Sequence, residues 1–191
     1  MLDLKNVDPS WTLFLDRDGV INHEKKMDYV YHYNEFVFYD RVQEALKIFS
    51  KYVGKMIIVT NQRGVGRGLM SENDLLQIHV QMIEDIRNSG GRIDEIFYCI
   101  STDNEHPDRK PNPGMAYLAQ KKFPLIDLKK SIMVGNNLSD MQFGRNAGMF
   151  TVHVRTTHPD IKLPHELIDM SFANLFDFAT ALQTAKENSK Y

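Results

Sequence analysis

The stretch WTLFLDRDGVIN, residues 11–22, is the starting point for interpreting the whole chain. It joins a short β-rich run, residues 11–15, to two aspartates, Asp16 and Asp18, which are followed by a glycine. A lone D-x-D sequence suits the polar turn after a strand and indicates no chemistry by itself. Two carboxylates this close repel each other unless something offsets their charge. The rest of the sequence must show whether other polar groups share their position.

Apolar runs of strand length alternate with segments of helical period along the chain. The pattern predicts five strands, at residues 11–15, 55–60, 96–100, 131–135 and 149–154. Strands that alternate with helices predict a parallel sheet covered on both faces by helices, which is an α/β fold of three layers. The sequence contains no repeat, low-complexity tract or linker, so residues 1–191 are expected to form a single domain.

Capping signals predict where three helices begin. Residues 40–54 carry apolar residues at helical spacing, and Asp40 is expected to cap the first turn. Ser71 and Asp74 have the spacing of a capping box, which predicts the start of a longer helix. Asn112, directly before a proline, is expected to be the N-cap of a third helix.

The composition excludes several classes of protein. The net charge of −2 gives no basic excess for nucleic acid or a membrane surface, so neither is an expected partner. The single cysteine, Cys99, excludes an internal disulfide framework. No apolar run reaches the roughly 18 residues of a membrane span. The first ten residues lack the pattern of a signal peptide, so the expected location is cytoplasmic.

Polar residues follow three of the predicted strands. Asp16 comes after the first strand, Thr60 ends the second, and residues 136–140 follow the fourth. Binding sites in open parallel sheets lie beyond the carboxyl ends of the strands. These three signals are therefore expected to share one edge of the sheet, which makes a common site far better supported than the D-x-D sequence alone.

Two neighbouring carboxylates suit phosphoryl transfer. In an extended backbone, Asp16 and Asp18 lie on the same face of the chain. One carboxylate can attack a phosphoryl group and form an aspartyl phosphate. Its neighbour can act as general acid for the leaving group and then as base for water, because close like charges raise one pKa of the pair.

A phosphate dianion facing two carboxylates requires a compensating cation. An oxygen-rich site selects magnesium, and Asn136 and Asp140 offer further oxygens. Thr60 can donate a hydrogen bond to a phosphoryl oxygen. Lys110, in a loop stiffened by two prolines, can neutralise charge on the transferred group.

Each of these residues also has an ordinary structural interpretation. Alone, Thr60 suits a strand end, Lys110 a solvated surface and Asn136 a turn. The glycine-rich RGVGRG, residues 63–68, is a weak match to a dinucleotide loop, and no P-loop sequence occurs. The seven histidines show no spacing typical of metal ligands.

Four motifs together resemble the haloacid dehalogenase (HAD) superfamily of phosphatases. They are FLDRDGVIN, IIVTNQRGVGRG, RKPNPGM and MVGNNLSDMQFGRNAGM. DRDGVIN, TNQxGxxRG and RKPxPGM are similar in particular to the branch that contains heptose bisphosphate phosphatases and histidinol-phosphate phosphatase domains. The resemblance covers about residues 11–154 and implies a Rossmann-like, HAD-like fold, a three-layer α/β/α sandwich without a large cap domain.

The resemblance also implies roles for individual residues. Asp16 is implied as the nucleophile and Asp18 as the general acid/base, with a magnesium ion on Asp16, the Asp18 backbone oxygen and the fourth motif. The cation would lie between the two carboxylates and offset their repulsion. Thr60 and Lys110 are implied to hold the phosphoryl group. Contacts with the rest of the substrate are implied for three residues: Asn61, Gln62 and Arg109.

Two positions depart from the pattern of that branch. Its members usually carry a zinc-binding loop before RKP, but this chain has only Cys99 and His106 there, too few for a four-coordinate site, so no structural zinc is expected. The fourth motif usually reads Gly-Asp, where this chain has Gly135 and Asn136. An amide oxygen can bind magnesium but brings no charge, so weaker metal affinity is expected.

The sequence therefore predicts a magnesium-dependent phosphatase of a small phosphorylated metabolite, with a heptose bisphosphate as the leading substrate. Histidinol phosphate is the nearest alternative, and a polynucleotide 3′-phosphatase is a remoter one. A non-catalytic phosphosugar-binding module is a rival from another class, motivated by Asn136. A two-component receiver domain also uses Asp, Thr and Lys, but its phosphorylated aspartate follows a later strand. The expected oligomeric state is a monomer or weak homodimer.

Overall fold

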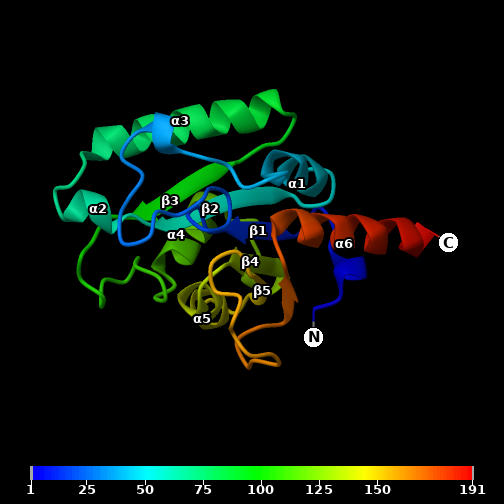
Figure 1. Ribbon diagram of the computed structural model, residues 1–191. Helices are drawn as coiled ribbons and strands as arrows, with labels where there is room; N and C mark the ends of the chain where they lie inside the picture. The colour runs from blue at the N-terminus through cyan, green and yellow to red at the C-terminus, as the bar shows by residue number, and fades with distance from the viewer. Residues whose placement is uncertain (1, 191) are drawn as a thin grey trace.

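The computed structural model describes residues 2–190, which contain one sheet of six parallel strands in the order β3-β2-β1-β4-β5-β6 (Figure 1). The strands are β1 (Thr12–Leu15), β2 (Lys55–Asn61), β3 (Glu95–Cys99), β4 (Ser131–Gly135), β5 (Phe150–Val154) and β6 (Met170–Phe172). All five predicted strands are present, and every strand end lies within one residue of its predicted position. The predicted three-layer fold is confirmed.

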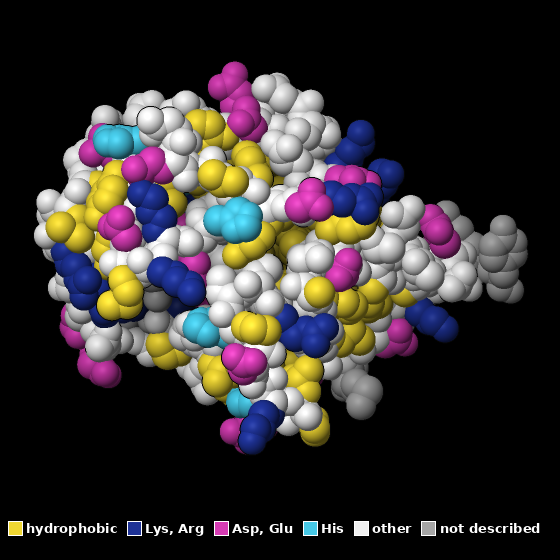
Figure 2. Space-filling view, in the orientation of Figure 1, with side chains coloured by type: hydrophobic (Ala, Val, Ile, Leu, Met, Phe, Trp, Pro, Cys, Tyr) yellow, Lys and Arg dark blue, Asp and Glu magenta, His cyan; other side chains and the backbone are white. Residues whose placement is uncertain are grey.

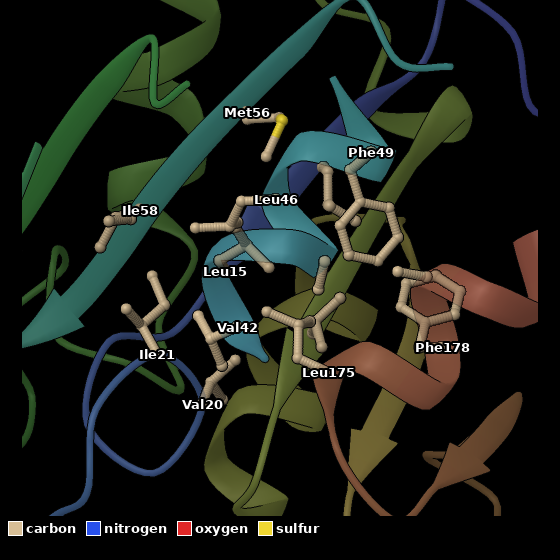
Figure 3. Packing of buried hydrophobic residues seen from close by; sticks show 14 of the residues in the cluster. Leu15, Val20, Ile21, Val42, Leu46, Phe49, Met56, Ile58, Leu175 and Phe178 are labelled. Atoms are coloured by element: carbon tan, nitrogen blue, oxygen red, sulfur yellow. The ribbon is translucent and has the colours of Figure 1, made fainter. Parts of the chain in front are cut away.

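Alternating strand residues separate two hydrophobic cores. In β1, Leu13 and Leu15 enter one core and Phe14 the other, as the period of a strand requires. The larger core is covered by α1 (Val42–Phe49), α3 (Glu72–Asn88) and α6 (Leu175–Glu187), and the smaller by α4 (Gly114–Lys122) and α5 (Leu138–Asn146). Figure 3 shows Leu15 with Phe49 and Phe178 in the larger core. Both faces of the central strands are thus buried, which fixes the strand ends.

The helix starts only partly follow the predicted caps. The capping box predicted for α3 is present. The prediction for Asp40 is wrong, because α1 begins after Arg41, which has a left-handed φ of 58° and makes no side-chain cap. The prediction for Asn112 is also wrong. Its amide donates instead to the carbonyl of His106 at 3.0 Å, and Pro113 occupies the N-cap of α4.

The segment between β1 and α1 is short and holds no cap domain. It contains one 3-10 turn (Tyr33–Glu35) and isolated bridges from Asn22 to Asp18 and Phe38. The sequence interpretation missed β6, which is three residues long and only half-buried, and so lacks an apolar run. Within residues 2–190, no helix combines the length and the apolar character needed to cross a membrane.

Candidate active site

The strand order has its reversal between β1 and β4. From β1 the chain builds β2 and β3 on one side, and from β4 it builds β5 and β6 on the other. Ligands of open α/β sheets bind beyond the carboxyl ends of the strands at such a switch point. Asp16 follows β1, with its amide bonded to the Val134 carbonyl at 3.0 Å, and Asn136 follows β4. The strand order therefore places these two residues at the expected position.

A polar hollow of about 160 Å³ opens at this switch point. Its walls bring together most of the residues selected from the sequence, namely Asp16, Asp18, Thr60, Asn61, Lys110, Asn136 and Asp140. The remaining two, Gln62 and Arg109, do not line this hollow. The structure therefore gathers the D-x-D pair and the three other motifs into one place, as the sequence predicts.

Lys110 links two carboxylates at the floor of the hollow. Its Nζ lies 2.9 Å from Asp16 Oδ1 and 2.7 Å from Asp140 Oδ1. Asn61 holds the backbone of this lysine, since its amide nitrogen donates to the Lys110 carbonyl at 3.0 Å and its amide oxygen accepts from the Lys110 N–H at 3.1 Å. The side-chain amide of Asn61 thus fixes the place where the lysine enters the site.

The pKa values of Asp16 and Lys110 are set by their burial and by the charges that they share. Burial raises the pKa of Asp16 above its usual range, and the charge of Lys110 only partly opposes it. Burial acts to lower the pKa of Lys110, but the Asp140 and Asp16 carboxylates outweigh burial and raise it. The lysine therefore stays charged, and the site has room for a further positive charge near Asp16.

Asp18 has a separate set of partners. Arg17 Nη2 lies 2.9 Å from each Asp18 oxygen, and the side-chain amides of Asn22 and Gln62 each donate to it at 2.9 Å. Burial acts to raise the pKa of Asp18, but the Arg17 charge and the hydrogen bonds from Arg17, Asn22 and Gln62 outweigh it, so the pKa is lowered. Asp16 and Asp18 thus contact different protein cations, Lys110 and Arg17.

The sequence interpretation missed Arg17. It placed a single cation between the aspartates. Arg17 is almost fully buried, and of the two aspartates its guanidinium pairs only with Asp18. The available signal was its place inside D-R-D, directly after a buried strand. A charged residue at a strand end usually reaches solvent, so its type alone did not indicate burial.

Thr60 and Gln62 form the wall beside Asp18. Thr60 is buried, and its Oγ1 accepts a hydrogen bond from Gln62 Nε2 at 2.9 Å. The same nitrogen donates to Asp18, so the Gln62 side chain is engaged by protein groups. Arg109 lies on the outer loop, half-buried, and donates to the Ser101 carbonyl at 3.3 Å.

Asn136 carries the clearest sign of a metal site. Its Oδ1 is buried without a hydrogen-bond partner among residues 2–190, while its Nδ2 donates to Thr157 Oγ1 at 2.5 Å. Gly19, at φ +87°, packs so closely that a Cβ there would lie 2.1 Å from Asn136 Nδ2. A buried orphan oxygen is costly unless something binds it.

The donor set at this position fits magnesium. The oxygens available are those of the Asp16 carboxylate, the Asp18 backbone and the Asn136 amide, because both Asp140 oxygens are engaged by Lys110 and the Asn137 N–H. Within the described chain, no three His, Cys, Asp or Glu residues gather as a metal cluster. Magnesium is commonly held by one or two carboxylates and retains several waters, so this sparse oxygen set suits it.

The loop before RKP, where members of the related branch usually bind zinc, brings two residues together. Cys99 Sγ lies 3.7 Å from His106 Nδ1, and burial raises the pKa of the Cys99 thiol. Two ligands are fewer than a structural zinc site requires. The expectation that the protein holds no structural zinc stays a prediction.

Comparison with known proteins agrees with this geometry. The family model described as "Polynucleotide kinase 3 phosphatase" matches residues 10–180. The D-glycero-alpha-D-manno-heptose-1,7-bisphosphate 7-phosphatase of Campylobacter jejuni is 41% identical over 140 residues, which are 73% of this chain and 79% of the relative. The enzyme of the same name from Mycobacterium tuberculosis is 33% identical over 177 residues, 92% and 93% of the two chains.

The fold is shared with a solved phosphatase. The D,D-heptose 1,7-bisphosphate phosphatase from B. bronchiseptica, complexed with magnesium and phosphate, superposes with a TM-score of 0.82 at 27% identity. The match covers 91% of this chain and 98% of that one. Fold and site together define a phosphohydrolase of the HAD type. The chain belongs to the polynucleotide kinase 3 phosphatase family of HAD-like phosphatases.

Proposed function

We propose that the protein is a magnesium-dependent phosphomonoester hydrolase that releases the 7-phosphate of D-glycero-D-manno-heptose 1,7-bisphosphate. The observation that carries the proposal is the polar hollow at the switch point, where Lys110 Nζ holds Asp16 Oδ1 at 2.9 Å beside the orphan Asn136 oxygen. This chain is 33–42% identical to three relatives that bear the name of this enzyme.

In this proposal Asp16 is the nucleophile. Its Oδ1 accepts from Lys110 and from the Arg17 N–H at 2.7 Å, which leaves Oδ2 to attack phosphorus. A P–O bond forms to Oδ2, the ester P–O bond breaks, and the aspartyl phosphate remains. Water then attacks phosphorus, releases inorganic phosphate and restores the carboxylate. Lys110 and the Thr60 hydroxyl stabilise the charge on the phosphoryl oxygens.

Asp18 is the general acid and base of the proposed reaction. It donates one to the leaving sugar oxygen and later takes one from the attacking water. Its pKa is lowered by Arg17 at rest, but a phosphate dianion placed beside it favours the protonated form. Gln62 and Asn22 hold its carboxylate in place, so their proposed role is positioning, as is that of Asn61 toward Lys110.

Magnesium would be held by the Asp16 carboxylate, the Asp18 backbone oxygen and Asn136 Oδ1. When bound, it offsets the repulsion between the carboxylate and the phosphate dianion and stabilises charge on the phosphoryl group. The B. bronchiseptica phosphatase was solved with magnesium and phosphate, which supports the same use here.

The substrate proposal is supported by the shape of the site. A second hollow, also of about 160 Å³, adjoins the first through Asp18, Glu24 and Asn61, and Lys25 and Tyr29 line its far part. A molecule longer than one phosphate group therefore has space beyond the reacting centre. We propose that this space takes the sugar, and that Arg109 contacts the substrate from the outer loop.

A phosphate-release screen tests the substrate. It compares kcat/KM for both anomers of the heptose bisphosphate, histidinol phosphate and a 3′-phosphorylated oligonucleotide. Relatives bear names with either anomer, so one of the two heptose substrates is expected to give the highest value. A higher value for histidinol phosphate or the oligonucleotide would overturn the proposal.

Charge does not favour a nucleic-acid substrate. The net charge is −2, and Figure 2 shows basic and acidic side chains interspersed on the face in view, without a broad basic patch. Nucleic acid binding draws on clustered Lys and Arg residues.

We further propose that the protein works in the cytoplasm. We also propose that it is a monomer or weak homodimer, and light scattering across a concentration series would test this oligomeric state.

A further inference from the structure

Arg17 is buried more deeply than its charge alone would allow. Its exposed fraction is 1%, and it stands between Asp18 and a second partner on α3. Nη2 binds both Asp18 oxygens at 2.9 Å, and Nη1 lies 3.2 Å from Nε2 of His79. The guanidinium therefore connects the active site to the inner face of a helix.

His79 is the neutral member of this connection. A guanidinium only donates hydrogen bonds, so Nε2 of His79 must be the acceptor, and the ring must carry its proton on Nδ1. The ring is 4% exposed, and burial together with the Arg17 charge lowers the pKa of His79 to about 3. At neutral pH this histidine therefore serves Arg17 as a fixed acceptor.

Stability alone does not account for this arrangement. Arg17 Nε is buried and has no hydrogen-bond partner among residues 2–190. Removing a guanidinium from water is expensive, and a buried ion pair often stabilises a protein no more than apolar residues of the same volume. The arrangement does, however, determine where the Asp18 carboxylate stands, which is what proton transfer requires.

We propose that His79 is a positioning residue for the phosphatase reaction, holding Arg17 so that Arg17 holds the Asp18 carboxylate toward the leaving oxygen. The inference rests on the proposed role of Asp18. Without the His79 acceptor, the Nη1 end of the guanidinium loses its only anchor on α3 and can turn about its side-chain torsions. Asp18 would then lose a two-oxygen contact that fixes its plane.

Two substrates separate this role from a general loss of structure. Departure of a sugar oxygen needs a proton from Asp18, whereas departure of nitrophenolate from p-nitrophenyl phosphate needs none. The ratio kcat/KM reports the steps up to formation of the aspartyl phosphate. A defect in placing Asp18 should therefore lower kcat/KM for the heptose bisphosphate and largely spare it for the aryl phosphate.

The experiment compares His79→Leu and His79→Gln with the wild type. We expect His79→Leu to lower kcat/KM for the heptose bisphosphate by about 10- to 100-fold, the scale of a misplaced general acid. The loss on p-nitrophenyl phosphate should stay under about threefold. His79→Gln should recover most of the activity, because its Oε1 can accept from Arg17. The half-saturating magnesium concentration should not change.

Ile78→Val is the matched control. It lies next to His79 on α3, is 1% exposed in the core, and its apolar side chain offers Arg17 no hydrogen-bond acceptor. It removes one methylene from the core, which should lower the midpoint of thermal unfolding without touching the Arg17 contact. Its kcat/KM should match the wild type on both substrates. Should His79→Leu fail to fold, His79→Met replaces it, since methionine fills irregular spaces.

The outcomes distinguish the two hypotheses. Equal losses on both substrates, no loss, or a glutamine variant as impaired as the leucine variant would overturn the positioning role of His79. An Asp18→Asn variant measured in parallel tests the proposed function itself. If Asp18→Asn keeps wild-type activity, the role of Asp18 is wrong, whereas an impaired Asp18→Asn beside an unimpaired His79→Leu rejects only the inference about His79.

Discussion

Asp16 and Asp18 stand one residue apart, yet their surroundings differ in kind. Asp16 shares one cation, Lys110, with Asp140, and burial raises its pKa. Asp18 has Arg17 to itself and accepts from two side-chain amides, so its pKa is lowered although burial acts in the opposite direction. Burial acts to raise the pKa of both carboxylates, so it does not explain the difference between them. The number of donors, and whether the cation is shared, explains it.

The contrast also gives each aspartate a different role in the proposed reaction. The Asp16 side is short of positive charge, which leaves a place for magnesium and a phosphate group. Both oxygens of the Asp18 carboxylate accept from protein groups, which suits a group that must be held still for proton transfer. Changes on the Asp16 side should therefore affect charge and metal, and changes on the Asp18 side should affect placement.

The largest effect is expected for Asp16→Asn. An amide cannot form the aspartyl phosphate, so turnover should be abolished while the fold survives. Phosphate release and the midpoint of thermal unfolding measure the two properties. Trapping of radiolabelled phosphate should mark the wild type and not the variant. A folded variant with near-native activity would show that Asp16 is not the nucleophile and would remove one half of the comparison.

Asp18→Asn should have the next largest effect, a loss of about 10²–10⁴-fold in kcat, which is typical of losing a general acid/base. The variant keeps one of the two oxygens that Arg17 binds, so its fold should be retained. Steady-state kinetics at saturating magnesium measure the loss. An effect on magnesium affinity rather than on kcat would contradict the division between the two aspartates.

The third effect concerns Asn136, on the Asp16 side of the site. Asparagine supplies an oxygen and no charge, and we expect a deficit of about 1–3 kcal/mol relative to aspartate, or about 5- to 150-fold in metal affinity. Asn136→Asp should lower the half-saturating magnesium concentration by this factor. An unchanged midpoint in a magnesium titration would show that residue 136 is not a ligand.

The same titration tests the rival class of function. A wild type that stays inactive at saturating magnesium, with activity restored by Asn136→Asp, would favour the non-catalytic sugar-phosphate-binding module. Thr157 provides a reason to expect a folded variant, because its hydroxyl, 2.5 Å from Asn136 Nδ2, can donate to an aspartate oxygen at the same place.

The sequence predicts the strands of this molecule better than the contacts between segments that are distant in the chain. Strands such as β2 and β4 are predicted because their apolar, β-branched runs are long enough to be buried on both faces. The strand β6 is not, because its three residues are half-buried at the sheet edge. The start of α1 depends on Arg41, whose cation lies 3.4 Å from the Phe176 ring centroid, a contact between distant segments that no local pattern contains.

The site shows the same division. That Asp16 and Asn136 share one edge follows from the parallel direction of the strands, which the alternating pattern predicts. The partners of each side chain do not follow, because they depend on how loops fold back on the strands. The Asn61 amide reaches the backbone of Lys110, and the Gln62 amide reaches Asp18, so both face protein groups where the motif alone suggests the substrate.

The smallest expected effect is on the pH dependence of stability, and it arises on the Asp18 side. The pKa of His79 is lowered from its usual 6.5 to about 3 in the folded protein. Between these values the unfolded chain binds a proton at this residue and the folded protein does not, so the free energy of unfolding falls as pH falls below about 6.5.

The comparison of wild type with His79→Gln isolates this proton, since the other histidines are the same in both. The wild type should lose about 1.4 kcal/mol more stability than the variant between pH 8 and pH 5.5. Urea unfolding at the two pH values measures the difference, which does not require the two proteins to be equally stable at pH 8. If both lose the same amount, His79 in the folded protein takes up its proton by pH 5.5. A protonated ring could not accept from Arg17, and at that pH the Asp18 side of the comparison would lack its anchor on α3.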